Sequence, residues 1–190
     1  MKQIFNTQKK ELSSSIHSTA TIYNNTIYLS GQRAKLSEIE GIDKKGFKEQ
    51  ARIAFGNIKD FLEEMGSSLD NVIMSYVYLS SMKYFDEMNE VYLEYFKGNI
   101  KPTRLTVSAK EILDDLDIQV SVIAVTDGKY KEVYDSNMKP FLSEISQTAT
   151  INDGIIRLNG QIGLNPYTGQ LEKENFKSQA KRAFENIKLL

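Results

Sequence analysis

The chain has 190 residues, of which 41% are hydrophobic and 26% charged, and it contains no cysteine. This is the composition of an ordinary globular protein, and the missing thiols exclude disulfides, thiolate metal sites and a cysteine nucleophile. With 24 basic against 25 acidic residues, it lacks the positive charge of a typical nucleic-acid binder, and neither a signal peptide nor a membrane-spanning run is visible. We therefore expect a cytoplasmic protein without nucleic-acid or membrane partners.

The first predicted elements are a β-hairpin and a long helix. Two apolar runs over residues 22–29 flank Asn24-Asn25, and asparagine tolerates the positive φ that a tight hairpin requires. From Phe47 to Met65 the apolar residues recur at helical spacing, and Gly66 is placed to end that helix.

The elements that follow complete an α+β pattern. Residues 72–79 predict a strand, 82–96 a second helix, and 105–109 and 118–125 two further strands. The order β-β-α-β-α-β-β predicts helices that cover one face of a mixed sheet. After residue 126 a polar linker begins, with a short strand expected at 131–134.

A long internal repeat dominates the rest of the chain. Residues 19–61 recur at 148–190 with a constant offset and no gap, so that Ser30-Gly31-Gln32 returns as Asn159-Gly160-Gln161. A repeat of this length indicates a duplicated domain and not a solenoid unit. We predict a complete domain over 1–126 and a linker with a truncated second copy over 127–190. The helix of that copy has one apolar face, which should pack on the first domain or on a neighbouring chain; this face comprises Phe176, Ala180, Ala183, Phe184 and Ile187.

Few residues carry a recognisable chemical signature. There is no phosphate loop and no His-Glu-x-x-His motif, and His17 is the only histidine, so a metal site is not expected. Asp114, Asp115 and Asp117 could suggest a cation site, but we interpret them as a solvated acidic turn.

An ordered set of motifs resembles the Rid family, also called the YjgF/YER057c/UK114 family. The set comprises Ser-Gly-Gln at 30–32, a Gln-Ala-x-x-Ala-x-x-Asn-Ile helix from 50, Gly-Ser-Ser-Leu-Asp-Asn-Val at 66–72, Asn-Glu-Val-Tyr at 89–92 and Pro-Thr-Arg at 102–104. The resemblance implies a chorismate-mutase-like fold and a homotrimer with ligand clefts between subunits. It also implies hydrolysis of 2-imino and 2-enamino acids to 2-keto acids and ammonia, without a cofactor or metal.

The resemblance assigns binding roles to five residues. Arg104 would anchor the substrate carboxylate, a task suited to a planar guanidinium that donates two parallel hydrogen bonds. Its alternative is a surface ion pair. Ser30 and Gly31 would line the cleft, or else simply mark a strand leaving the sheet. Thr106 and Asn89 complete the predicted substrate-binding set.

Two departures from the family pattern concern catalysis. Gln119 stands where active members carry a glutamate, and an amide can orient a water molecule but cannot accept its proton. His17 stands where many members have a tyrosine, and it is either a bystander or a replacement base. The alternative to a deaminase is therefore a non-catalytic module that binds small carboxylates. The endoribonuclease or translation-inhibitor activity attributed to some relatives is disfavoured by the acidic balance and the single histidine.

Overall fold

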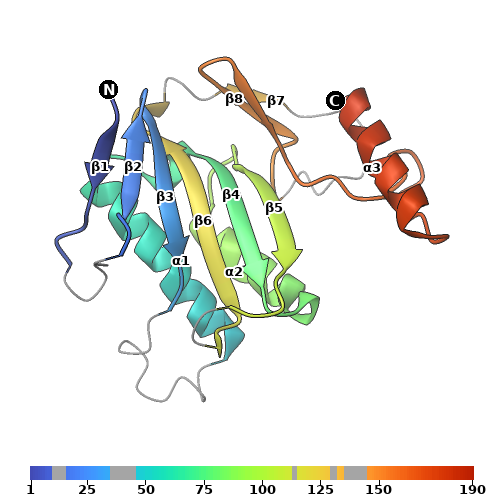
Figure 1. The fold of residues 1–190 in the computed structure, drawn as a ribbon, viewed down its shortest axis with the longest axis horizontal. Coiled ribbons are helices and arrows are strands. Elements are labelled where there is room, and N and C mark those ends of the chain that lie inside the picture. Colours follow the sequence, from blue (N-terminus) through green and yellow to red (C-terminus); the bar gives the residue numbers. More distant parts are fainter. Residues whose placement is uncertain (10–15, 35–45, 113–114, 129–131, 135–144) are drawn as a thin grey trace.

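A computed structural model of the chain describes residues 1–9, 16–34, 46–112, 115–128, 132–134 and 145–190. Its largest unit is a six-stranded sheet with the order β1-β2-β3-β6-β4-β5 (Figure 1). The strands are β1 Gln3–Phe5, β2 Ala20–Tyr23, β3 Thr26–Gln32, β4 Val72–Leu79, β5 Thr103–Ser108 and β6 Ile118–Val125. Neighbouring strands are antiparallel except β4 and β5, which are parallel, so the predicted mixed sheet is confirmed.

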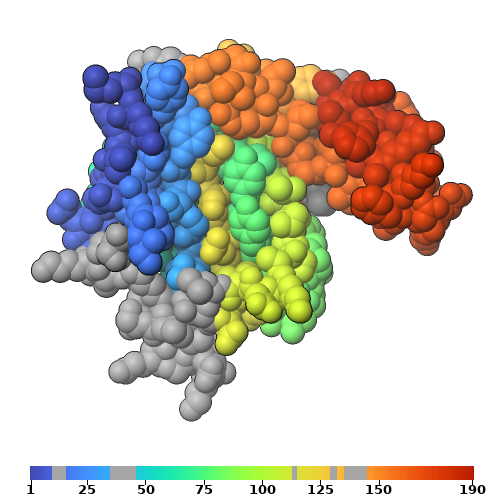
Figure 2. Space-filling model, in the orientation of Figure 1, coloured from blue at the N-terminus to red at the C-terminus, as the bar shows by residue number. Residues whose placement is uncertain are grey.

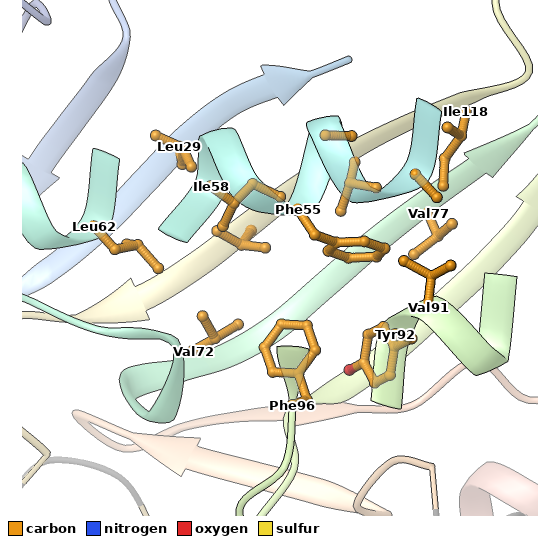
Figure 3. Packing of buried hydrophobic residues seen from close by; sticks show 14 of the residues in the cluster. Leu29, Phe55, Ile58, Leu62, Val72, Val77, Val91, Tyr92, Phe96 and Ile118 are labelled. Carbon is orange, nitrogen blue, oxygen red and sulfur yellow. The ribbon is translucent and has the colours of Figure 1, made fainter. Parts of the chain in front are cut away.

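Two helices, α1 Phe47–Glu64 and α2 Phe85–Tyr95, cover the same face of this sheet (Figure 1). Phe55 on α1 lies at the centre of the core, where its ring meets Tyr92 edge-on and contacts Phe96 (Figure 3). Side chains of β3, β4 and β6 close the core from the sheet. The predicted arrangement of helices on one face of the sheet is therefore confirmed.

Most element boundaries agree with the sequence pattern. Asn24 and Asn25 take positive φ values of 45° and 58° in the β2–β3 turn, and Gly66 follows α1 with φ 74°. The second helix differs from the prediction, because residues 82–84 form a 3-10 turn and the α-helix begins only at Phe85. The Ser81 hydroxyl accepts a hydrogen bond from the Lys83 amide and so stabilises this tighter start.

A second, three-stranded sheet has the order β7-β8-β9 and is followed by α3. Its elements are β7 Glu132–Tyr134, β8 Ala149–Asn152, β9 Ile155–Leu158 and α3 Phe176–Leu189. β7, β8 and α3 begin at 132, 149 and 176, and β1, β2 and α1 begin at 3, 20 and 47, so one constant offset, that of the sequence repeat, relates the two sets. The β8–β9 turn at Asp153-Gly154 has φ values of 49° and 72°, positive like those of Asn24-Asn25 in the β2–β3 turn.

The β8–β9 hairpin packs on the first sheet at β4 and β5. The Thr150 hydroxyl donates to the Ile73 carbonyl at 2.8 Å, and the Gly160 amide donates to the Arg104 carbonyl at 2.9 Å. Thr150 and Thr103 are both completely buried where the two units meet. The carboxyl-terminal segment, residues 127–190, is thus attached to the first domain through its hairpin.

The apolar face of α3 is not packed on the first domain. Phe176 is 85% exposed and Phe184 is 68% exposed. Figure 2 shows this segment, in red, projecting at one end of the molecule. The predicted packing of this helix face on a neighbouring chain stays a prediction. No helix of the described residues combines the length and the apolar character that crossing a membrane requires.

Candidate functional site

Arg104 is a buried arginine on β5. Its side chain packs against three residues of α2. The guanidinium carbon lies 4.8 Å from the centre of the Tyr92 ring and 5.7 Å from the centre of the Phe85 ring. Nη1 lies 3.7 Å from the sulfur of Met88. The residue as a whole is only 7% exposed. Aromatic rings attract a guanidinium held over their faces, so these contacts fix the position of the cation.

No carboxylate of the described residues pairs with this guanidinium. Burial lowers the pKa of Arg104 from its usual value, and the neighbouring Tyr92 opposes the shift. A buried charge is costly unless an opposite charge compensates it. The alternative of Arg104 as a surface ion pair is therefore wrong, because the residue is buried and has no carboxylate partner among the described residues.

Tyr92 supplies a neutral neighbour to this cation. Burial raises the pKa of Tyr92 to about 12, against the hydrogen bond with Ser75, whose hydroxyl lies 3.2 Å from the phenol oxygen. The phenol therefore stays protonated near neutral pH and does not neutralise Arg104.

Two other predicted binding residues present unpaired polar atoms. The hydroxyl oxygen of Thr106 and the amide oxygen of Asn89 are buried without a hydrogen-bond partner in the described structure. Thr106 follows Arg104 by two residues along β5 and so shares its face of the strand, while Asn89 lies one helical turn after Phe85. Buried polar groups normally find a partner, so both groups are available to a ligand.

Ser30, Gly31, Gln119 and His17 form a second group, where β3 leaves the sheet. The Ser30 hydroxyl donates to the Ser18 carbonyl at 2.7 Å, and exposed His17 directly precedes Ser18. A Cβ on Gly31 would lie 2.6 Å from Nε2 of Gln119, so only glycine leaves room for that side chain. The structure thus brings these four predicted residues together.

The two groups do not meet within one chain. β6 and β4 lie between β3 and β5, because Leu29 pairs with Val122, Val122 with Ser75, and Ser75 with Arg104. Three strand spacings correspond to roughly 14 Å, which exceeds the length of a small keto acid. A ligand that touches both groups needs the second group from another part of the chain or from another chain.

The sequence pattern did not reveal two features of the Arg104 site. Phe85 entered the sequence analysis only as part of the second helix and Tyr92 only through that helix and the Asn-Glu-Val-Tyr motif, although their seven-residue spacing places them on one side of the helix. Gly160 was recognised only as the repeat of Gly31, whereas the structure places it beside Arg104. Among the described residues no cluster of acidic and histidine side chains could hold a metal ion, and Asp114 of the acidic turn lies outside them.

Comparison with known proteins assigns the first domain to a class. The yeast Mmf1 crystal structure matches with a TM-score of 0.61 and 31% identity over 67% of this chain and all of that one. A RutC family protein of Saccharolobus solfataricus is 38% identical over 127 residues, which cover 65% of this chain and 98% of the relative. The 2-iminobutanoate/2-iminopropanoate deaminase of Rattus norvegicus is 28% identical over 125 residues, or 66% of this chain and 90% of the enzyme. The domain is thus a mixed α+β unit of the YjgF/RidA type.

The family follows from the model that matches residues 8–126, described as endoribonuclease L-PSP. That match spans more than half of the chain, so the protein belongs to this family, which also contains the RutC and YjgF proteins.

Proposed function

We propose that the protein binds 2-imino and 2-enamino acids through Arg104 and hydrolyses them to 2-keto acids and ammonia. The observation that carries the proposal is the buried guanidinium without a carboxylate partner among the described residues. The deaminase name of the rat relative supports this choice of substrate. Small carboxylates such as 2-keto acids are then the expected ligands.

The proposed reaction depends more on positioning the substrate than on a strong acid or base. Arg104 holds the carboxylate, the protonated imine carbon is already electrophilic, and water adds to that carbon before ammonia leaves. No cofactor or metal is part of this scheme. Gln119 would orient the water, with His17 as the candidate base, since a glutamine cannot take up the proton.

The separation of the two residue groups bears on the oligomer. Gln119 lies on β6 and His17 precedes β2, so β4 separates both from Arg104 on β5, and in this scheme they act on a substrate held by a neighbouring chain. We therefore propose a homotrimer with sites between subunits, as the family resemblance implies. A mass measurement in solution tests it, and a purely monomeric protein would contradict it. The proposed location is the cytoplasm, although the yeast relative Mmf1 is named a mitochondrial protein.

We also propose that residues 127–190 are a linker and a truncated second copy of the first domain. The pairing register supports this: Gln3 pairs with Ile22 as Glu132 pairs with Ile151. A side-chain contact is repeated as well, since the Asn57 amide donates to the Arg33 carbonyl and the Asn186 amide to the Ile162 carbonyl, at 3.4 and 3.1 Å. In each case the residue in the second copy follows its equivalent in the first copy by the offset of the sequence repeat.

Replacing Arg104 tests the anchor. Arg104→Ala removes a charge-assisted bidentate contact whose hydrogen bonds are worth about 1.5–3 kcal/mol each, so titration calorimetry should show no binding of 2-ketobutyrate. Arg104→Lys should not restore it, because a lysine cannot reproduce the planar fork. Arg52→Ala, which breaks an exposed ion pair with Glu94, is the matched control. Unchanged affinity in Arg104→Ala would show that the site lies elsewhere.

Replacing Gln119 separates the deaminase from its alternative, a non-catalytic carboxylate-binding module. The alternative is favoured by the missing glutamate, and an endoribonuclease is disfavoured by the net charge of −1. Gln119→Glu supplies a proton acceptor of similar size, and general-base assistance is typically worth about 10²–10⁴ in rate. Ammonia release from 2-iminobutanoate should therefore rise in the variant. No release from either protein, with binding intact, would favour the module.

A further inference from the structure

The edge of β5 is closed at Arg104 by the carboxyl-terminal segment. β5 is the last strand of the six-stranded sheet, and the Gly160 amide donates to the Arg104 carbonyl at 2.9 Å. A Cβ on Gly160 would lie 2.9 Å from Cδ1 of Leu105 and 3.6 Å from its Cα, so a larger residue fits here only if the Leu105 side chain moves. The buried Thr150 hydroxyl lies 3.5 Å from that of Thr103, the residue before Arg104 on β5, and so fixes the same junction.

The segment that closes this edge has the structure of the β3 end. The Ser30 amide donates to the Thr19 carbonyl at 3.0 Å, and the Asn159 amide donates to the Thr148 carbonyl at the same distance. The first strand end faces Gln119, whereas the second lies against β5. The same strand-end structure therefore occurs twice in the chain, once beside Gln119 and once beside Arg104.

Gln161 adds an unpaired polar atom on the segment next to this junction. Its amide nitrogen donates to the side-chain oxygen of Asn159, while its amide oxygen is buried without a partner in the described structure. Thr106, two residues beyond Arg104, carries the other unpaired atom on this edge. Unsatisfied buried groups are costly, and a ligand with a hydrogen-bond donor beside its carboxylate would satisfy an acceptor such as Gln161.

We infer that the strand end Asn159-Gly160-Gln161 completes the Arg104 site within the same chain. Gly160 positions the β5 edge through its amide, and Gln161 offers a hydrogen-bond acceptor to the ligand. The inference rests on the proposed function, because it takes the small carboxylate at Arg104 as the ligand. It adds that, at this site, the carboxyl-terminal segment of the chain that carries the arginine takes the place that the homotrimer scheme gives to the β3 end of a neighbouring chain.

A cross-link tests whether the contact forms within one chain. The double variant Leu105→Cys/Gly160→Cys introduces two thiols into a chain without cysteine, at positions where a Cβ on residue 160 would lie 3.6 Å from Cα of residue 105, close enough for a disulfide to be tried. Mild oxidation should give a single-chain species, seen as a mobility shift on a non-reducing gel and a loss of two hydrogens by intact mass. Each single variant is the control. Disulfide-linked dimers, or no cross-link at all, would overturn the assignment to the same chain.

Ligand binding tests whether the contact matters to the site. Gly160→Pro removes the donated amide and should weaken 2-ketobutyrate binding about tenfold, whereas Lys173→Pro, the same change at an exposed position of the same segment, should not. Gln161→Met keeps the backbone contact and the side-chain length but removes the acceptor. It should weaken a carboxylate ligand bearing an amino group, such as 2-aminobutyrate, several-fold more than 2-ketobutyrate.

The outcomes separate the inference from the proposed function. Loss of binding in Arg104→Ala together with full binding in Gly160→Pro and Gln161→Met would overturn the inference and leave the function standing. Full binding in Arg104→Ala would overturn both.

Discussion

The helices α1 and α3 have nearly the same apolar pattern and opposite surroundings. Phe55 of α1 is completely buried, whereas Phe184, which occupies the equivalent position in the sequence repeat, is 68% exposed. Ile58 and Ile187 show the same contrast, at 0% and 43%. In the first domain Tyr92 and Phe96 pack on the Phe55 ring, and β6 and β4 lie beneath it, while the described residues leave α3 uncovered.

The comparison shows what a helical pattern determines and what it does not. Apolar spacing and a capping residue such as Asn175, whose side chain accepts from the Ser178 amide at 3.0 Å, suffice to define where a helix lies. Most of a helix's stability comes from the tertiary partners of its apolar face. In the first domain the partners of α1 come from later parts of the chain. In the carboxyl-terminal segment the described residues show α3, a helix of similar pattern, without such partners.

Separating the two regions should give the largest effect. Residues 1–126 contain both helices and the six strands of a complete core, so this fragment should show a cooperative melt. Residues 127–190 expressed alone should be unfolded or aggregated, because their apolar helix face is uncovered. Circular dichroism during heating measures both. A cooperative, monomeric melt of the second fragment would refute the proposed truncated copy.

Paired alanine substitutions should show the contrast at single residues. Phe55→Ala should lower the free energy of unfolding by about 3–5 kcal/mol, the usual cost of removing a buried phenylalanine. Phe184→Ala should change it by less than about 0.5 kcal/mol, as for other exposed positions. Urea denaturation of both variants supplies the values. Equal losses would mean that α3 is covered in solution by a neighbouring chain.

Alkaline pH should affect the first region through Tyr92. The pKa of Tyr92 is about 12 in the folded protein and near 10 in the unfolded chain, so the folded state binds more protons between these values. Stability is then fully present below pH 10 and falls as the pH rises towards 12, by up to roughly 3 kcal/mol. Urea denaturation across this range measures the loss. The variant Tyr92→Phe should have a flatter profile, whereas Tyr134→Phe and Tyr167→Phe, at exposed positions of the carboxyl-terminal segment, should not.

The sequence allowed the family motifs of the first domain and its elements other than β1 to be predicted, but not the neighbours of its site. The Asn24-Asn25 turn, Gly66 and the apolar spacing of α1 are local signals, and the structure follows each of them. That β6 inserts between β3 and β4 depends on pairing over about 90 residues, which no local pattern encodes. For this reason the sequence did not show that β6 and β4 separate Ser30 from Arg104 within one chain.

The burial of Arg104 was also beyond prediction, because a lone arginine in a strand is usually exposed. Only the combination of β5 with the α2 face creates its surroundings. The contact with Gly160 needs, in addition, the position of the second sheet on the first.

The pairing of Arg104 with Tyr92 also gives the protein an optical probe. The chain has no tryptophan, so its near-ultraviolet absorbance and emission come mainly from ten tyrosines. Tyr92 is completely buried, with its ring 4.8 Å from the guanidinium, and the hydrogen bond to Ser75 further restricts it. A rigid ring beside a charge gives a distinct circular dichroism signal, and an anion that pairs with the guanidinium should alter that signal by changing the charge beside the ring. Occupancy of the site can therefore be followed spectroscopically in the unlabelled protein.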